Sequence, residues 1–140
     1  EERGLLGSAY YASHAAVPIE STIAMLNLDM VGRARGAVDV SGLDEPPTRE
    51  ADLKAPARPV GGGLQTKREG PGAGRSDDSN FIDRRIPAIN FFTGFHSDYH
   101  RPSDDWEKID AAGTKRVATL ALELAARLAN RMERPEFKSR

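Results

Sequence analysis

The clearest pattern in the chain is a stripe of apolar residues near its carboxyl end. Five apolar residues recur at steps of three or four, the spacing that places side chains on one face of an α-helix. They are Val117, Leu120, Leu124, Leu128 and Met132. Asp110 precedes the stripe and is a good amino-terminal cap, whereas Pro135 follows it and cannot continue a helix. The pattern predicts a long amphipathic helix whose apolar stripe is buried.

Three apolar runs predict buried strands, and a shorter run predicts a fourth. They are residues 21–29 (STIAMLNLD), 37–41 (AVDVS), 86–93 (IPAINFFT) and 64–67 (LQTK). Short helices are expected at residues 4–14 and 79–84, with a turn at residues 31–33. Strands that alternate with helices indicate an α/β layer fold. Because a parallel sheet normally has both faces covered, we expect further strands from outside this chain to complete the core.

Residues 43–74 interrupt the alternation of predicted strands and helices and are rich in Pro and Gly. The segment contains five prolines and a run of three glycines at residues 61–63, a composition typical of a loop or insertion. We interpret it as part of a single domain that includes the whole of residues 1–140. The chain begins with Glu and lacks a signal-peptide pattern, so we expect the natural start to lie upstream.

Composition narrows the possible functions only modestly. Twenty basic side chains face 21 acidic ones, so no strong field favours nucleic acid or an anionic membrane surface. The absence of cysteine excludes disulfides and thiolate metal sites. The longest apolar stretch, around residues 117–128, carries Glu123 and Arg127, and we expect no membrane span.

Acidic and histidine side chains stand at three places that an α/β fold could bring together. Asp29 closes an apolar strand, His100 follows the strand at residues 86–93, and Glu1 and Glu2 precede the first helix. Zinc accepts imidazole nitrogen and carboxylate oxygen, and ligands bind at the carboxyl ends of parallel strands. Each residue also has an ordinary structural interpretation, as a solvated charge, a strand-end acid or a surface-loop histidine. Tyr99 could stabilise an oxyanion or simply pack as an aromatic.

Four segments, in this order, resemble metallopeptidase family 28, the aminopeptidases with two co-catalytic zinc ions. They are EERGLLGSAYY, IAMLNLDMVGR, SDDSNF and FFTGFHSDYHRPSDDWEKID. The resemblance extends from residue 1 to about residue 128, except for residues 43–70. It implies a three-layer α/β/α zinc-exopeptidase-like fold with a mostly parallel mixed sheet. This chain would then be the carboxyl-terminal part of the catalytic domain, and the amino-terminal strands would be missing from it.

The resemblance also implies roles for particular residues in binding two zinc ions and in catalysis. Glu1 would be the general base, Glu2 and His100 would bind one zinc, and Asp29 would bind the other. Tyr99 resembles a tyrosine that steadies the oxyanion in some family members. The family's first zinc-binding histidine and its bridging aspartate would lie upstream, so we expect this chain alone to be inactive.

The same resemblance predicts a substrate pocket. Ser76, Asp77 and Asp78 resemble the family's pocket loop, and Phe92 and Phe95 are expected to line the site for the first side chain. The family usually has Ser-Asp-His where this chain has Ser-Asp-Asp, so an additional negative charge could change the preferred residue.

The resemblance implies a parent protein that removes amino-terminal residues from peptides in an extracellular or periplasmic location. Two alternatives remain open: a non-catalytic binding or structural module, and a one-zinc transferase similar to glutaminyl cyclase. The upstream sequence would test the first alternative, and zinc stoichiometry would test the second.

Overall fold

The computed structural model describes residues 1–42, 64–67, 75–135 and 137. Its helices are α1 (Leu6–Ser13), α3 (Ser79–Ile82) and α4 (Ala111–Ala129), with 3-10 turns at Ile19–Ser21, Val31–Arg33 and Trp106–Lys108. Its strands are β1 (Met25–Asp29), β2 (Ala37–Ser41), β3 (Gln65–Lys67) and β4 (Ala88–Phe92). The described strands and helices occur where the sequence pattern predicts them. β2 has the predicted bounds, and the other strands and the α-helices are shorter than predicted.

The four strands form one mixed sheet in the order β1-β4-β2-β3. β1 runs parallel to β4 and β2 parallel to β3, whereas β2 and β4 are antiparallel. Asp29 of β1 is level with Phe92 of β4, and Phe92 is level with Asp39 of β2. These three residues therefore form a row across the sheet, close to the carboxyl ends of β1 and β4.

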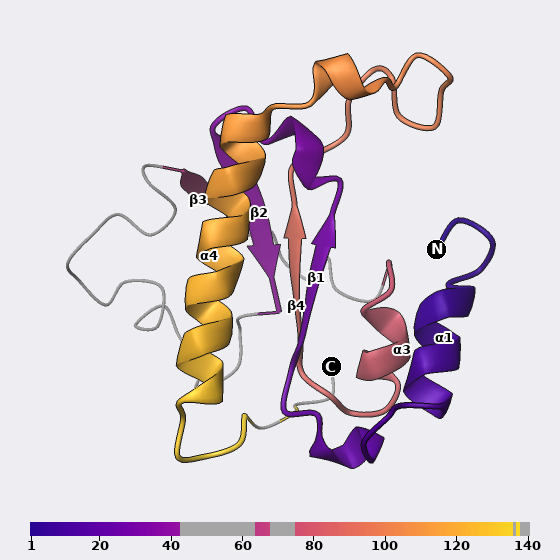
Figure 1. Cartoon of the computed structure of the whole chain (residues 1–140), viewed down its shortest axis with the longest axis vertical. Coiled ribbons are helices and arrows are strands. Elements are labelled where there is room, and N and C mark those ends of the chain that lie inside the picture. The colour runs from indigo at the N-terminus through magenta and orange to yellow at the C-terminus, as the bar shows by residue number, and fades with distance from the viewer. Residues whose placement is uncertain (43–63, 68–74, 136, 138–140) are drawn as a thin grey trace.

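Helices lie on both sides of the sheet, as Figure 1 shows. α4 follows one face, and α1 lies beside α3 on the other side. Alternate residues of β2 and β4 are buried in one core with the apolar stripe of α4. The main members are Val38, Val40, Ile89, Phe91, Val117, Leu120, Leu124 and Leu128. This arrangement confirms the predicted α/β fold with a mostly parallel sheet.

The start of α4 is fixed by a side-chain cap and a glycine. The Asp110 carboxylate accepts a hydrogen bond from the backbone N–H of Gly113 at 2.8 Å, as the sequence predicts. A Cβ at position 113 would lie 2.2 Å from Asp110 Oδ2 and 2.8 Å from the Ala34 Cβ. Glycine is therefore required for the cap to form while the helix packs this closely.

One prediction about the core is wrong. The apolar stripe predicts that Met132 is buried, but its side chain is fully exposed. α4 ends at Ala129, and the Asn130 side chain donates a hydrogen bond to the carbonyl of Ala126 at 2.7 Å. Because the helix stops there, residue 132 no longer lies on the face that meets the sheet.

Two further sequence predictions concern the Pro- and Gly-rich loop and membrane-spanning helices. Most of the predicted loop, residues 43–63 and 68–74, lies outside the described residues, whereas residues 65–67 within it form β3. Among the helices that the structure describes, none has both the length and the apolar character needed to cross a bilayer.

Candidate active site

The sheet face opposite α4 carries polar side chains. Because Val38 and Val40 point into the core, Asp39 and Ser41 of β2 point to the other side. On the same side, the Asn27 side chain of β1 donates a hydrogen bond to Asn90 Oδ1 of β4 at 3.0 Å. Both asparagines are buried, and the hydrogen bond between them gives these buried polar groups a partner away from water.

A cavity of about 710 Å³ opens on this polar face. Seven of the residues selected from the sequence line it: Glu1, Glu2, Asp29, Ser76, Phe92, Phe95 and Tyr99. The lining also includes Met30, Asp39, Ser41, Arg75, Asn90 and Gly94. The cavity thus joins the chain start, the segment before α3 and the carboxyl ends of β1 and β4.

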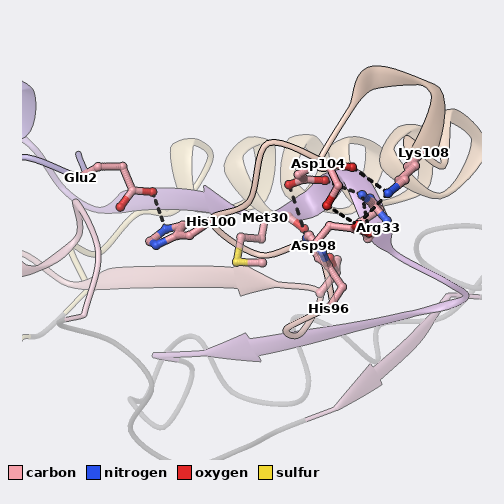
Figure 2. A network of polar contacts seen from close by, with 10 residues as sticks. Glu2, Met30, Arg33, His96, Asp98, His100, Asp104 and Lys108 are labelled. Atoms are coloured by element: carbon pink, nitrogen blue, oxygen red, sulfur yellow. Dashed lines mark hydrogen bonds and ion pairs between the residues drawn. The ribbon is translucent and has the colours of Figure 1, made fainter.

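Glu2 and His100 meet directly, although they are 98 positions apart in the sequence. The distance between Glu2 Oε1 and His100 Nε2 is 2.8 Å, and Figure 2 shows this contact. His100 has the left-handed backbone conformation, with a φ of 54°, and its ring stacks on Tyr99 at a centroid distance of 3.8 Å. Both contacting side chains are largely exposed, so each is accessible from solvent.

Asp29 reaches the cavity from the end of β1. The next residue, Met30, adopts a left-handed conformation with a φ of 53°, which bends the chain out of the strand. The Thr93 hydroxyl, just after β4, donates a hydrogen bond to the Met30 carbonyl. This contact joins the two strand ends that supply Asp29 and Phe92 to the cavity.

Three aromatic rings form one wall of the cavity. Phe92 and Phe95 meet edge to face at 5.1 Å between centroids, and Phe95 meets Tyr99 in the same way at 4.9 Å. Such edge-to-face pairs are favourable because the positive ring edge points at a negative ring face. The wall presents apolar surface beside the acidic residues.

The loop that carries His100 is held by a charged network, which Figure 2 also shows. Lys108 Nζ lies 2.6 Å from Asp98 Oδ1, and Arg33 pairs with Asp104 and, at 3.6 Å, with Asp98. The hydrogen bond from Lys108, followed by one from Ser103, lowers the pKa of Asp98 to about 2. The network therefore keeps Asp98 ionised and ties the loop to the turn after β1.

Sequence reasoning did not identify the part played by Arg33 and Lys108 in this loop. Both lie inside the segments that carry the family resemblance, but a single basic residue has no distinctive spacing. The side chain of His96, in the same loop, is buried, and its Nε2 lies 3.7 Å from Asp104 Oδ2. Within the described residues its Nδ1 has no hydrogen-bond partner.

The residues of the predicted pocket loop have different surroundings. Ser76 lines the cavity. Asp77 instead accepts a hydrogen bond from the Ser8 hydroxyl of α1. Asp78 is completely buried and accepts a hydrogen bond from the backbone N–H of Ser76 at 3.1 Å. Within the described part of the chain, Asp77 and Asp78 lie outside the cavity lining, so their role in substrate binding stays a prediction.

The acidic and histidine side chains do not form one compact metal-binding cluster. Across residues 1–42, 64–67, 75–135 and 137, no group of three or more His, Cys, Asp or Glu side chains is placed to hold one ion. Glu2 and His100 contact each other. Asp29 lines the same cavity as Glu2 but is not part of this pair.

The fold and cavity define an α/β protein whose site lies at the carboxyl ends of parallel strands. The family model described as Peptidase family M28 matches residues 1–125, and the chain belongs to that family. It is 34% identical over 109 residues to leupeptin-inactivating enzyme 1 of Streptomyces exfoliatus, covering 77% of this chain and 24% of that protein.

Solved structures show the same fold. An aminopeptidase from Aneurinibacillus sp. strain AM-1 matches 99% of this chain with a TM-score of 0.67 and 30% identity. The LapA aminopeptidase of Legionella pneumophila matches 94% with a TM-score of 0.69 and 20% identity. BSAP, a zinc aminopeptidase from Bacillus subtilis, matches 97% with a TM-score of 0.65 and 21% identity. This chain spans 32%, 38% and 36% of those three chains, respectively.

Proposed function

We propose that the protein containing this chain is a zinc-dependent aminopeptidase, which hydrolyses amino-terminal residues from peptides. The observation that carries the proposal is the contact between Glu2 and His100 beside a cavity that Glu1, Glu2 and Asp29 line. Family membership and the aminopeptidases among the structural neighbours, one of which is a zinc aminopeptidase, support the same reaction class.

The donor types fit zinc, which binds imidazole nitrogen and carboxylate oxygen. Glu2 and His100 would hold one ion and Asp29 the other, which agrees with their arrangement as a pair and a separate acid. Bound zinc polarises a carbonyl oxygen and makes water a stronger acid. The remaining ligands would come from the part of the protein outside this chain, so we expect the 140-residue chain alone to lack activity.

The other residues of the cavity have roles that follow from their chemistry. Glu1 would take a proton from the attacking water and pass it to the leaving amine, as a general base and acid. The Tyr99 hydroxyl would donate a hydrogen bond to the developing oxyanion. Phe92 and Phe95 would contact the first side chain of the peptide, because their rings form the apolar wall beside the acids.

The test uses the complete protein that contains this chain. We expect it to bind two zinc ions, to release the first residue from short peptides, and to lose and regain this activity when zinc is removed and restored. His100→Ala should lower zinc content and activity. The matched control is His14→Ala, since His14 is an exposed histidine at the end of α1 that hydrogen-bonds locally to the Tyr10 carbonyl.

The outcome also separates the alternatives. A protein that binds a single zinc and cyclises amino-terminal glutamine would be the transferase. A protein that binds no zinc and cleaves no peptide would be a non-catalytic module. Either result would overturn the proposed aminopeptidase function.

A further inference from the structure

A fourth carboxylate lines the cavity, separated from the predicted zinc ligand Asp29 by one strand. Asp39 of β2 is the direct cross-strand partner of Phe92, and Phe92 is the partner of Asp29 on its other side. Adjacent strands lie about 4.8 Å apart, so the backbones of Asp29 and Asp39 are separated by roughly 10 Å. All three residues line the cavity, and the Phe92 position lies between the two acids.

This arrangement places an apolar surface between two acidic ends of the cavity. At one end are Glu1, Glu2 and Asp29, where the peptide amino terminus would be held. Phe92 and Phe95 follow, and Asp39 lies beyond Phe92. A lysine or arginine side chain fits this arrangement. Its apolar stem can pack on aromatic rings, and its charged head can pair with a carboxylate.

We propose that Asp39 is a specificity-determining residue that makes the enzyme prefer peptides with an amino-terminal lysine or arginine. The inference rests on the proposed aminopeptidase function and names the substrate class of that site. Asp39 also interacts with other groups of the protein. A carboxylate offers about four acceptor positions, however, so an existing contact leaves room for a substrate cation.

Arg75 in the cavity lining is a basic residue that competes with a substrate cation for Asp39, and Lys67 of β3 is the other cross-strand partner of Asp39. Arg75 lies in the segment before α3, and its side chain is exposed, whereas Asp39 is partly buried. Solvent and salt screen an exposed charge more strongly than a partly buried one. We therefore expect the carboxylate of Asp39 to dominate the choice of side chain, and an acidic first residue to be a poor substrate.

The test measures kcat/KM of the complete, zinc-loaded protein on matched peptides that begin with lysine, arginine, norleucine or glutamate. Norleucine has the apolar stem of lysine without its charge. We expect lysine and arginine to exceed norleucine by about ten- to hundredfold, the range of a charge-assisted contact. Asp39→Asn should lower kcat/KM for the lysine and arginine peptides and so remove most of this preference. Asp39→Glu should retain a preference for the cation.

The matched control is Asp83→Asn, which removes an exposed acid at the end of α3, outside the cavity lining that the structure describes. It should leave the lysine-to-norleucine ratio unchanged. A second readout is calorimetric binding of free L-lysine and L-norleucine to the wild-type protein and to Asp39→Asn. Only the wild type should favour L-lysine.

The two proposals fail in different ways. Turnover of all peptides without a preference for basic residues, a preference for glutamate, or an Asp39→Asn variant with the wild-type ratio would overturn the role of Asp39 and leave the aminopeptidase intact. Absence of zinc-dependent turnover on any peptide would overturn the aminopeptidase. In that case the calorimetry decides: equal binding of L-lysine and L-norleucine would also remove the role of Asp39.

Discussion

The two faces of the same sheet have opposite characters, although the same strands build both. On the α4 side, Val40 and Phe91 belong to a core of closely packed apolar side chains. On the cavity side, Asp39, Ser41 and Asn90 present polar groups. Because side chains alternate along a strand, one strand can supply stability through one face and chemistry through the other. Substitutions on the two faces should therefore have separable effects on stability and on activity.

The separation is not complete, because the polar face is also partly buried. Asn27 and Asn90 lie away from solvent and hydrogen-bond to each other between β1 and β4. A buried polar group costs free energy unless it is paired. The buried polar side chains on the cavity side must therefore hydrogen-bond to each other, or this face of the sheet would be destabilised.

The largest expected effect comes from the cavity side and should appear in activity alone. Glu1→Gln in the complete protein should lower kcat by roughly 10²- to 10⁴-fold, because it removes the proposed general base. Zinc content and thermal stability should stay close to those of the wild type, since Glu1 is exposed. Glu20→Gln, at an exposed acid in the turn after Pro18, is the control. A kcat within twofold of the wild type for Glu1→Gln would show that Glu1 is not the base.

The next largest effect belongs to the α4 side and should appear in stability alone. Leu124→Ala should lower the free energy of unfolding by about 2–5 kcal/mol, because it removes a buried side chain and leaves a cavity. Leu122→Ala on the same helix is the matched control, because Leu122 is 70% exposed and Leu124 only 2%. It should cost less than about 0.5 kcal/mol. Denaturant unfolding measures both values, and equal losses would contradict the assignment of the buried face.

A smaller effect on stability is expected at the polar side chains of the cavity face that are themselves buried. Asn27→Ala should cost about 1–3 kcal/mol, because it leaves the buried Asn90 side chain without its hydrogen-bond partner. Replacing both asparagines with leucine should cost less than the sum of the single changes Asn27→Leu and Asn90→Leu, since no buried polar group is then left unpaired. A double-mutant cycle by denaturant unfolding gives this coupling. Additive losses would mean that the pair does not act as a unit.

The contrast between the two faces also explains how much of the molecule the sequence could predict. The strands and α4 followed from alternation and from the apolar stripe, because burial leaves a periodic signal. Met132 was misplaced because the stripe does not reveal where a helix ends. Asp39 could not be recognised as a pocket residue, because in AVDVS it is simply the polar residue expected between two buried valines.

The proposed metal ligands illustrate a second limit. No spacing rule relates Glu2 to His100 across 98 positions. Their places in the chain allow them to meet in an α/β fold, but only the resemblance to a known family predicts that these two residues form a pair. The charged network around Asp98 was missed for the same reason, since Arg33 comes from the turn after β1 and Lys108 from the turn before α4. Contacts between distant loops depend on the completed fold, whereas helices and strands depend mainly on local pattern.

The smallest expected effect concerns the cap of α4, where the core helix begins beside the loop that carries His100. Asp110→Ala should cost about 1 kcal/mol of stability, because the Gly113 N–H loses its acceptor. Asp110→Asn keeps an acceptor in place and should cost only a few tenths of that. The backbone N–H of Asp110 donates to the Gly32 carbonyl at 2.8 Å, and this bond survives either substitution. The His100 loop should therefore keep its position, and kcat should be unchanged while the midpoint of denaturant unfolding falls. A parallel loss of kcat would show that the cap also holds the cavity loop, and the division of labour between the two faces would then be weaker than the sheet alone suggests.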